Sequence, residues 1–580
     1  MIETLFLKST ADKPPLKVGV MVDSDQLISS FAEVLRHIQQ SNFAHLAFVI
    51  RNIAEPPRPP AAGSKLARLL RYGLDKRMRS NIAYSKYRQW DLVRQRDGEP
   101  SVFEAVDCAD MLASLPAITV KPISKGFVDR FPAEAVEAVR AERLDIILRF
   151  GFRILRGDVL DTARYGVWSY HHGDGDRFRG APPAFWELAE REPLSGAMLQ
   201  VLTERLDDGI VLAKTLAPTT QGISVYRNAI APYLAAEPLV IQKLHQLHER
   251  GWEEVLASAP PKSDYKGRRE LYRSPTVSEL GRFVGRELVD HGLRKLKIKP
   301  RIGMGYWRTA IRRAGAGLVP PWQGDWSDFR WIEPVNRFIA DPQLIEHEGR
   351  TWMFVERLVL ATNRAHICCA ELFDDGTMGP LEVALETPYH LSLPVVFHHD
   401  GAVFMIPEAA ESGRIELFRA VDFPYRWKHE HTLLDMPGLD TVMHIGEDGG
   451  TYFFTSLRHK PHAHPNLFLF RTNGLFEPWQ MHPASPLSLD ARYARNAGPI
   501  LEIEGKFHRP SQDLTGFYGR QMHFHRIERL NAREYKETLV GQRPVAPGWD
   551  KAVIGTHTYA RTSKWEAIDG YFLGLPDNYE

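Results

Sequence analysis

The chain has 580 residues, of which 44% are hydrophobic and 25% are charged, and its formal net charge is +1. At about 150 residues per domain, this length predicts two or three domains. No apolar run approaches the roughly 18 residues of a membrane span, and the N-terminal segment lacks the basic and apolar regions of a signal peptide, so we expect a soluble, cytoplasmic protein.

Short β-rich runs alternate with helical patterns from the N-terminus. The run LKVGVMVD (16–23) predicts a strand, and the amphipathic segment QLISSFAEVLRHIQQ after it predicts a helix capped within Asp23–Asp25. Further strands are predicted over 45–52, 144–150 and 165–171. This alternation predicts a doubly wound α/β sheet, in which ligands bind beyond the carboxyl ends of the strands.

Basic residues are concentrated in two segments. Residues 65–96 hold ten Lys and Arg against two acids, and residues 262–315 hold fifteen against five. The first segment also has an apolar stripe, formed by Leu66, Leu69, Leu70 and Leu74. Two interpretations stay open: these segments are solvated faces, or they bring the protein to an anionic membrane surface or another polyanion.

Titratable residues gather in the segment VWSYHHGDGDRFRGAPPAFWEL (167–188), directly after a predicted strand. Mixed His and Asp ligands would suit a divalent ion, and the candidates are His171, His172, Asp174 and Asp176. Gly-rich acidic loops also stay solvated, and we predict no metal site. Neighbouring side chains on a strand point to opposite faces, so His172 is expected to pack in the core if His171 faces a ligand.

The same segment resembles the active-site stretch of the folate-dependent formyltransferases, Gly-x-x-Asn-x-His-x-Ser-Leu-Leu-Pro-x-x-Arg-Gly-x-x-Pro. The matching residues are Gly166, His171, Arg179, Gly180 and Pro183. The segment SGAMLQVLTERLDDGIVLAK (195–214) is similar to a later motif of that family through Gly196, Leu206, Asp207 and Gly209. The resemblance spans roughly residues 16–240 and implies a formyltransferase-like, Rossmann-type domain.

The resemblance implies formyl transfer from 10-formyltetrahydrofolate to an amine. The family uses an Asn-His-Asp trio, in which donors stabilise the oxyanion and the carboxylate orients the His. His171 and Asp207 occupy the His and Asp positions, Ser169 stands at the Asn position, and Gly173–Asp176 form an acidic stretch that we expect to be flexible. The candidate substrate- or cofactor-binding residues are Arg179, Gly180, Asp174 and Asp176.

From about residue 320 the pattern changes to strands and turns that repeat. The turn glycines Gly349, Gly401, Gly449 and Gly505 are 52, 48 and 56 residues apart, and a weaker fifth copy covers 559–574. Repeats of this length that are built from short strands predict a β-propeller, and five blades fit the length. We therefore predict an α/β domain over 1–260, a basic linker over 261–320 and an all-β propeller over 321–580.

The propeller sequence resembles five-bladed glycoside hydrolases and the N-terminal region of glucosamine inositolphosphorylceramide transferases. The segments that carry this resemblance are FIADPQL, HLSLPVVF, MIPEA, FPYRWK, RNAGPIL and RPSQDLTGFYG. We expect eight residues to converge on the central channel: Asp341, His390, Glu408, Asp440, Arg495, Arg509, Gln512 and Asp513. Asp341, Glu408 and Asp440 could supply the carboxylate pair of glycoside chemistry, or could cap turns and fix the inner strands. A third interpretation is that the propeller only binds sugar.

Two functions remain open. In the first, the chain formylates the amine of a nucleotide- or lipid-linked amino sugar in cell-surface glycan synthesis, and the propeller binds the glycan. In the second, the propeller transfers or hydrolyses a glycosyl group, and a degenerate formyltransferase-like domain only binds a donor or partner. The propeller stands where transfer-RNA formyltransferases have a C-terminal barrel, so we expect no nucleic acid partner. The sequence does not determine the oligomeric state.

Overall fold

The computed structural model describes residues 2–53, 75–94, 102–205, 209–296, 305–315, 319–332, 338–544 and 552–573. The chain divides into two compact units. Unit 1 comprises Met1–Gly292 with His459–His464, and unit 2 comprises Leu293–Arg458 with Pro465–Glu580. Within the described ranges, every helix is too short or too polar to span a membrane.

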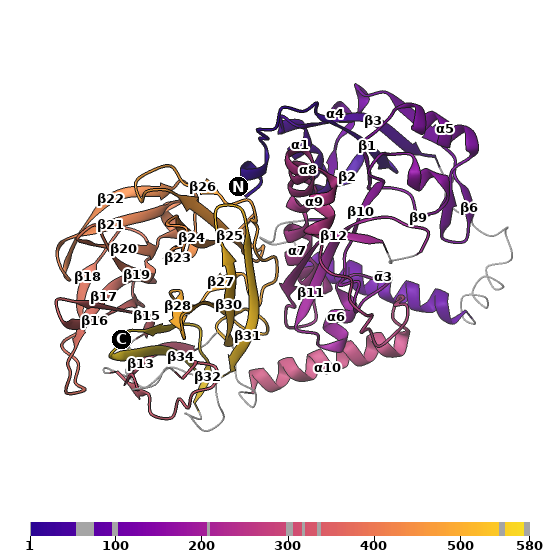
Figure 1. Cartoon of the computed structure of the whole chain (residues 1–580). Coiled ribbons are helices and arrows are strands. Elements are labelled where there is room, and N and C mark those ends of the chain that lie inside the picture. The colour runs from indigo at the N-terminus through magenta and orange to yellow at the C-terminus, as the bar shows by residue number, and fades with distance from the viewer. Residues whose placement is uncertain are drawn as a thin grey trace. The chain divides into compact units, whose positions relative to one another are not determined.

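Unit 1 is built on a seven-stranded sheet in the order β12-β11-β10-β8-β1-β3-β5 (Figure 1). Its parallel strands are β1 (Leu16–Val22), β3 (Ala44–Asn52), β5 (Ala117–Val120), β8 (Ile146–Arg149) and β10 (Val167–His171). Antiparallel pairing adds β11 (Leu194–Val201) and β12 (Ile210–Pro218) at one edge. The predicted α/β fold and the four strands predicted for it are confirmed.

The helices of unit 1 are α1 (Ser29–Gln40), α3 (Lys76–Arg94), α4 (Ala109–Ala113), α5 (Ala133–Ala141), α6 (Phe185–Glu190), α7 (Val225–Ala236), α8 (Pro238–Arg250), α9 (Trp252–Ala257) and α10 (Val277–Lys295). Short strands pair outside the main sheet: β2 (Gln26–Ile28) with β4 (Ala105–Asp107), and β7 (Val128–Arg130) with β6 (Ile123–Lys125) and β9 (Ile154–Leu155). Single 3₁₀ turns cover Ile2–Phe6 and Asp158–Asp161.

The start of α1 differs from the sequence-based prediction. The helix begins at Ser29, after β2, and Ile28 precedes it without a side-chain cap. Asp23 instead accepts hydrogen bonds from the Phe152 backbone N (2.8 Å) and from Asn52 Nδ2 (2.7 Å). This acid therefore ties the end of β1 to residues that follow β8 and end β3, a tertiary role that a local pattern does not reveal.

Unit 2 is a five-bladed β-propeller, as predicted (Figure 1). The first two blades are β15 (Phe338–His347), β16 (Arg350–Val359), β17 (Arg364–Leu372) and β18 (Glu382–Leu385), then β19 (Ser392–His399), β20 (Ala402–Glu408), β21 (Ile415–Asp422) and β22 (Arg426–Leu434). The third is β23 (Leu439–Ile445), β24 (Thr451–Leu457), β25 (Asn466–Thr472) and β26 (Gln480–Met481). A single 3₁₀ turn, Ala410–Ser412, follows β20.

The fourth blade is β27 (Arg495–Asn496), β28 (Leu501–Ile503), β29 (Lys506–Asp513), β30 (Gln521–Leu530) and β31 (Tyr535–Pro544). The fifth combines β13 (Gly305–Arg313) and β14 (Arg330–Trp331) with β32 (Val553–Gly555), β33 (Tyr559–Arg561) and β34 (Trp565–Leu573). Because β13 pairs along its whole length with β34, strands from both ends of the unit close the ring in one sheet.

The repeat glycines form the predicted turns. Their φ angles are 78° at Gly349, 73° at Gly401, 74° at Gly449 and 69° at Gly505. The residues before three of them are left-handed as well: Glu348, Asp400 and Glu504. Two successive residues of this kind form the type I′ turn, whose twist matches that of the flanking strands, and glycine adopts the conformation without steric cost.

Hydrogen bonds join each blade to the next around the propeller axis. In blade order they run from Leu393 N to Asp341 Oδ2 (3.2 Å), Asp440 N to Glu408 Oε2 (2.9 Å), Asn496 Nδ2 to Asp440 O (2.7 Å), Tyr559 N to Ala497 O (2.9 Å) and Asp341 N to Asp569 Oδ2 (3.3 Å). A buried polar group without a partner is costly, so these bonds stabilise the closed ring.

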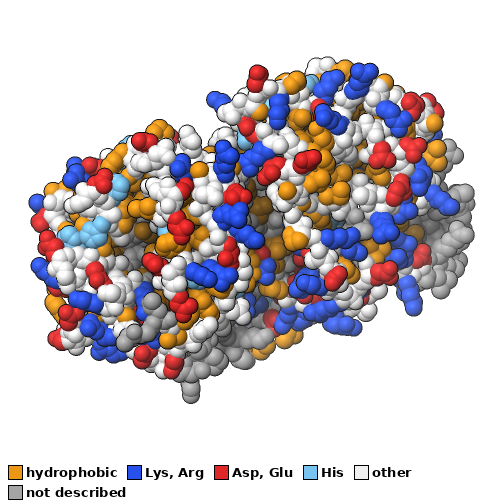
Figure 2. Space-filling view, viewed as in Figure 1, with side chains coloured by type: hydrophobic (Ala, Val, Ile, Leu, Met, Phe, Trp, Pro, Cys, Tyr) orange, Lys and Arg blue, Asp and Glu red, His pale blue; other side chains and the backbone are white. Residues whose placement is uncertain are grey.

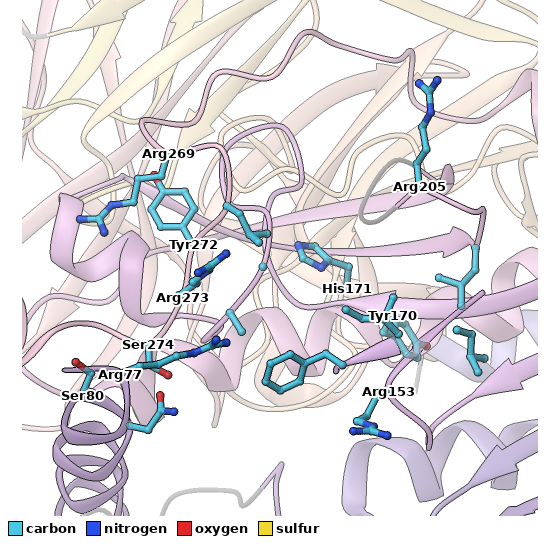
Figure 3. A pocket seen from close by; sticks show the side chains of 18 of the residues that line it. Arg77, Ser80, Arg153, Tyr170, His171, Arg205, Arg269, Tyr272, Arg273 and Ser274 are labelled. Atoms are coloured by element: carbon cyan, nitrogen blue, oxygen red, sulfur yellow. The ribbon is translucent and has the colours of Figure 1, made fainter. Parts of the chain in front are cut away.

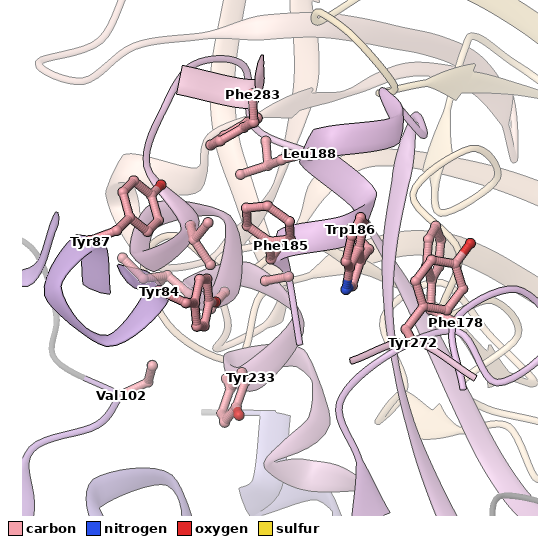
Figure 4. Close-up of a cluster of buried hydrophobic side chains, with 14 of the residues drawn as sticks. Tyr84, Tyr87, Val102, Phe178, Phe185, Trp186, Leu188, Tyr233, Tyr272 and Phe283 are labelled. Carbon is pink, nitrogen blue, oxygen red and sulfur yellow. The ribbon is translucent and has the colours of Figure 1, made fainter. Parts of the chain in front are cut away.

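The segment predicted as a linker, 261–320, contains folded parts of both units. In unit 1, α10 packs through Leu280 and Phe283 into a buried cluster with Phe185 and Tyr272 (Figure 4). In unit 2, β13 completes the fifth blade. The high positive charge of the segment masks this helix and this strand, whose few apolar residues are spaced to bury one face.

Candidate functional site

A cavity of about 1090 Å³ lies in unit 1 beyond the carboxyl ends of β8 and β10 (Figure 3). Its wall includes Arg149 at the end of β8, Tyr170 and His171 at the end of β10, and Gln200 of β11. The first turns of α3 and the segment 269–279 also contribute to the wall. The cavity therefore occupies the position where a sheet of this type binds ligands.

His171 is positioned by a main-chain carbonyl. Its Nε2 lies 3.0 Å from Phe178 O, and because a carbonyl only accepts, Nε2 carries the proton in this contact. A Cβ on Gly173 would lie 3.0 Å from His171 Nε2 and 3.1 Å from Phe178 O. Glycine at this position therefore permits the contact, and proton exchange falls to Nδ1 of the imidazole.

Ser169, at the position of the family's Asn, holds an arginine. Arg149 Nε donates to Ser169 Oγ (3.0 Å), and Arg149 Nη1 donates to the carbonyls of Phe152 (3.1 Å) and Arg153 (2.9 Å). Arg149 lines the cavity, whereas Ser169 is buried behind it. The sequence analysis missed Arg149, although it ends the strand predicted at 144–150, beside the strand that carries Ser169.

The remaining residues proposed from the formyltransferase resemblance do not form one site. Gly180 lines the cavity. Arg179 donates to Gly175 O (3.2 Å) and its guanidinium carbon lies 4.4 Å from the centre of the Tyr265 ring, so it braces the loop. Asp207 lies outside the residues that the structure describes, and its assignment as the orienter of His171 stays a prediction.

Asp174 and Asp176 bind Lys214 of β12, at 2.5 Å and 2.7 Å from its Nζ. Partial burial raises the pKa of Asp176, but its hydrogen bond with Lys214 outweighs burial and the pKa is lowered overall. A Cβ on Gly175 would lie 2.4 Å from Met198 Cε. The loop is therefore packed and neutralised, which differs from the flexible loop predicted from the sequence, because the compensating lysine lies on a distant strand.

His172 packs inside unit 1 and does not line the cavity, as predicted from strand alternation. Its ring stacks on Tyr233 with the ring centres 3.5 Å apart and the planes 7° apart, and burial lowers its pKa to about 3. This imidazole is neutral at physiological pH. The metal ligands considered from the sequence thus have separate roles: His171 contacts Phe178, His172 stacks, and both acids bind Lys214.

The cavity wall is strongly basic. Its basic side chains are Lys76, Arg77, Arg149, Arg153, Arg205, Arg269 and Arg273, and its acid among the described residues is Glu279. Glu279 pairs with Arg269 (2.7 Å) and accepts a hydrogen bond from the Thr276 backbone N (2.8 Å), which caps α10. Four of the seven basic residues come from the two basic segments of the sequence, which therefore converge on one cavity.

Four of the eight channel candidates form one hydrogen-bonded group, here called the axis group: Glu408, Asp440, Arg495 and Gln512. Arg495 forms an ion pair with Asp440 and lies 3.3 Å from Glu408 Oε2, and Gln512 Nε2 donates to Asp440 Oδ2 (3.2 Å). Burial, with the nearby Asp440 carboxylate, raises the pKa of Glu408 to about 8.

Asp341 joins a second group, with His557 and Asp569, that the sequence analysis missed. His557 Nδ1 lies 2.6 Å from Asp569, its Nε2 lies 3.5 Å from Asp341, and its ring stacks on Trp307. Burial lowers the pKa of His557, but the two carboxylates outweigh burial and raise it to about 9. The three side chains offer ligand atoms within 4.8 Å of one another, and a metal ion would have to displace the His557 proton.

His390 pairs with Glu356, whose carboxylate lies 3.2 Å from His390 Nε2 and whose pKa burial raises to about 7. Glu356 has the same place in the first blade as Glu408 in the second, since each pairs with the residue just before the β-bulge of its neighbouring strand. Comparison of the repeats FVE (354–356) and IPE (406–408) could have found it.

Arg509 and Asp513 form no hydrogen bond with the side chains of these groups, although Arg509 Nη1 donates to Asn496 Oδ1 (3.4 Å), and their place on the channel stays a prediction. Arg509 Nη2 lies 2.7 Å from Glu537 of β31, and Asp513 accepts a hydrogen bond from Gln521 Nε2 of β30 (2.7 Å). Both side chains therefore bind to outer strands of their own blade, which the position of a residue in an inner repeat strand does not reveal.

These two units define a chain that joins a formyltransferase-like α/β unit to a five-bladed propeller. Residues 331–551 match the family model described as glucosamine inositolphosphorylceramide transferase 1, N-terminal. The glucosamine inositolphosphorylceramide transferase 1 of Oryza sativa subsp. japonica is 33% identical over 275 residues, which cover 44% of this chain. The matched region spans only 36% of that protein's own length.

The methionyl-tRNA formyltransferase of Chlorobium limicola is 27% identical over 177 residues, which cover 30% of this chain and 52% of that protein. Among solved structures, glycinamide ribonucleotide transformylase 1 from Symbiobacterium toebii covers 41% of this chain and 89% of its own, with 16% identity and a TM-score of 0.27. The chain is therefore similar to two kinds of transferase.

Proposed function

We propose that unit 1 transfers a formyl group to the amine of an amino sugar in glycan synthesis, and that unit 2 binds the glycan. The observation that carries this proposal is His171, held by Phe178 O on the wall of a large cavity at the strand ends. The similarity to methionyl-tRNA formyltransferases supports the reaction, and the similarity to glucosamine inositolphosphorylceramide transferases supports a sugar acceptor. Residence in the cytoplasm stays a prediction from the sequence.

10-Formyltetrahydrofolate would supply the formyl group, and the cavity fits such a ligand. Its volume of about 1090 Å³ is at the upper end of small-molecule sites, which hold one drug-sized ligand, so it leaves room for an acceptor. Phe127 and Leu155 would offer apolar surface to the ring system, and Arg205 would offer charge to the carboxylates.

Attack of an amine on a formyl carbon forms the new C–N bond and builds negative charge on the formyl oxygen. The guanidinium of Arg149, which Ser169 holds in place, can stabilise this charge, and the imidazole of His171 can do so once its Nδ1 carries the amine proton. His171 would accept the amine proton through Nδ1, because Nε2 keeps its own proton toward Phe178 O. It would then donate this proton to N10 of the cofactor, as the bond between N10 and the formyl carbon breaks and tetrahydrofolate leaves. In this proposal Arg149 replaces the amide donor of the family.

The test is a transfer assay on the full chain with 10-formyltetrahydrofolate and a panel of nucleotide-linked and lipid-linked amino sugars. Mass spectrometry should detect one added formyl group per amino sugar, with one tetrahydrofolate released. The matched control is each sugar with a hydroxyl in place of the amine, which should not react. Absence of transfer to every amino sugar would contradict the proposal.

The axis group favours a second candidate function, in which unit 2 transfers or hydrolyses a glycosyl group. With a pKa of about 8, Glu408 holds a proton at neutral pH and could donate it to a leaving group, while Asp341 could act as the partner carboxylate. Glycosyl transfer or release that is lost in Glu408→Gln and unchanged in His171→Ala would establish this function instead.

A further inference from the structure

We infer that the basic wall of the unit 1 cavity binds a diphosphate, centred on Lys76, Arg77 and Arg273. The acceptor of the proposed formyl transfer would then be a sugar diphosphate. This last step rests on the proposed function, whereas diphosphate binding itself rests on the cavity and its charges alone.

Several basic side chains of the wall are already committed to the protein. Arg153 Nη2 lies 2.7 Å from Asp129 Oδ1, and Arg153 Nη1 donates to Gly126 O (2.9 Å). Arg269 pairs with Glu279 and stacks on Trp186, with its guanidinium carbon 4.1 Å from the ring centre. These contacts neutralise or occupy the two arginines, so they contribute structure more than charge to the cavity.

Lys76, Arg77 and Arg273 differ, because none of them forms an ion pair with an acid within the described ranges of the chain. The guanidinium carbon of Arg77 lies 5.4 Å from the centre of the Phe127 ring, a contact that leaves its charge without a counter-charge. Their backbones are nevertheless fixed. Arg77 N donates to Asp75 Oδ1 (2.8 Å) at the start of α3, and Arg273 O accepts from Trp186 Nε1 (3.0 Å). Figure 3 shows the Arg77 and Arg273 side chains extending into the cavity from two different elements.

Like charges gathered without a counter-charge repel one another, and a bound anion removes that cost. Two guanidinium groups and an ammonium match a diphosphate, because arginine binds phosphate oxygens in a bidentate manner and lysine adds a point charge. Ser274 and Asn81 line the same part of the wall and could donate neutral hydrogen bonds. A solvated surface would not require 65–96 and 262–315 to converge in this way.

Nucleotide-linked and lipid-linked sugars share the diphosphate, and the surroundings of Arg77 bear on both. Arg77 also borders a hollow of about 340 Å³ on α3, next to Met78 and Ile82, whose exposed fractions are 37% and 43%. An apolar tail could lie there, whereas a nucleoside would occupy the main cavity. Uridine diphosphate and geranyl diphosphate are therefore the probes that distinguish the two sources.

The experiment is calorimetric titration of the full chain with inorganic pyrophosphate, followed by the two diphosphate probes. Arg77→Gln and Arg273→Gln should each weaken pyrophosphate binding by about tenfold to a hundredfold, as expected for lost charge-assisted hydrogen bonds. The matched control is Arg282→Gln, which removes an exposed arginine of α10 outside the cavity and should leave the affinity unchanged. Thermal unfolding of each variant verifies its fold.

His171→Asn separates this inference from the proposed function, because it should abolish formyl transfer and keep pyrophosphate binding. Tighter binding of uridine diphosphate than of pyrophosphate identifies a nucleotide-linked acceptor, and tighter binding of geranyl diphosphate identifies a lipid-linked one. Absence of pyrophosphate binding in the wild type, or equal binding in Arg77→Gln, Arg273→Gln and Arg282→Gln, would overturn the inference.

Discussion

The propeller axis and the unit 1 cavity both concentrate charged side chains, but the two regions differ in how far these charges are paired with opposite charges. At the axis, Arg495 pairs with Asp440 and His557 pairs with Asp569, and both pairs are buried. In the cavity, Lys76, Arg77 and Arg273 are exposed and have no acidic partner among the described residues.

We interpret the paired charges of the axis as stabilising the fold, and the cavity charges without an acidic partner as available to bind a ligand. The carboxylates of Asp341, Glu408 and Asp440 each accept a hydrogen bond from a neighbouring blade, so these acids have a structural role whether or not they also react. Arg77 and Arg273 form no comparable ion pair with the described residues of the chain. Charged residues therefore have a structural role at the propeller axis, whereas those on the cavity wall are the candidates for ligand binding.

The largest effect is expected from removing an axis acid. Asp440→Ala leaves Arg495 buried with one carboxylate fewer, and loss of one partner of a buried pair typically costs about 3–5 kcal/mol. Urea denaturation should detect this loss in unit 2. The control Asp422→Ala removes an exposed acid of β21 and should change the free energy of unfolding by less than about 0.5 kcal/mol. Equal effects of both variants would contradict the structural role.

The pH dependence of stability should depend on Glu408. Its folded-state pKa of about 8 lies above the ordinary value of 4.5, so its stabilising contribution is full below about pH 4.5 and is lost as the pH rises through 8. Between pH 5 and 8 the wild type should therefore lose more stability than Glu408→Gln, which cannot ionise. Parallel stability curves for the two proteins would exclude the raised pKa.

Gly173→Ala tests the positioning of His171. A Cβ there would lie 3.0 Å from His171 Nε2, so the imidazole must shift, and misplacement of this size is expected to lower formyl transfer by about tenfold to a hundredfold. The matched control is Gly285→Ala on α10, where a Cβ meets nothing within 4 Å. Steady-state kinetics should show a fall in kcat for the first variant alone, and equal kinetics would refute the positioning role.

Much of the fold was predictable because its patterns are local or periodic. Strand alternation indicated the sheet of unit 1, and evenly spaced glycines such as Gly349 and Gly401 indicated the propeller. His171 was singled out by the formyltransferase motif, and it lies at the end of β10 on the cavity wall. The sequence did not predict the folded elements within 261–320, because the many charged residues of α10 obscured the apolar positions Leu280 and Phe283.

The contacts that define the sites were not predictable, because their partners are distant in sequence. Arg149 reaches Ser169 across two neighbouring strands, and Lys214 neutralises the acidic loop from β12. Likewise, nothing near Arg77 in the sequence indicates that it shares a cavity with Arg273. Sequence periodicity determines which element a residue belongs to, whereas charge pairing depends on how elements meet.

The smallest effect concerns membranes, an expectation from the sequence that stays a prediction. α10 exposes Leu288 and Val289, at 60% and 61%, on a helix with several arginines, and Lys and Arg side chains gather over this part of unit 1 (Figure 2). Leu288→Ser should weaken co-sedimentation with anionic vesicles by a few fold, and raised salt should weaken it further. Binding indifferent to lipid charge and salt would contradict this expectation.

The central claim is that the cavity of unit 1, and not the propeller axis, carries out the reaction. Formyl transfer to an amino sugar, measured side by side in the wild type, His171→Ala and Glu408→Gln, tests it most directly. We expect His171→Ala to lose about 10²–10⁴-fold in turnover, as for the loss of a general acid–base group, and Glu408→Gln to stay near the wild type. Unchanged transfer in His171→Ala, or loss in Glu408→Gln alone, would contradict the claim.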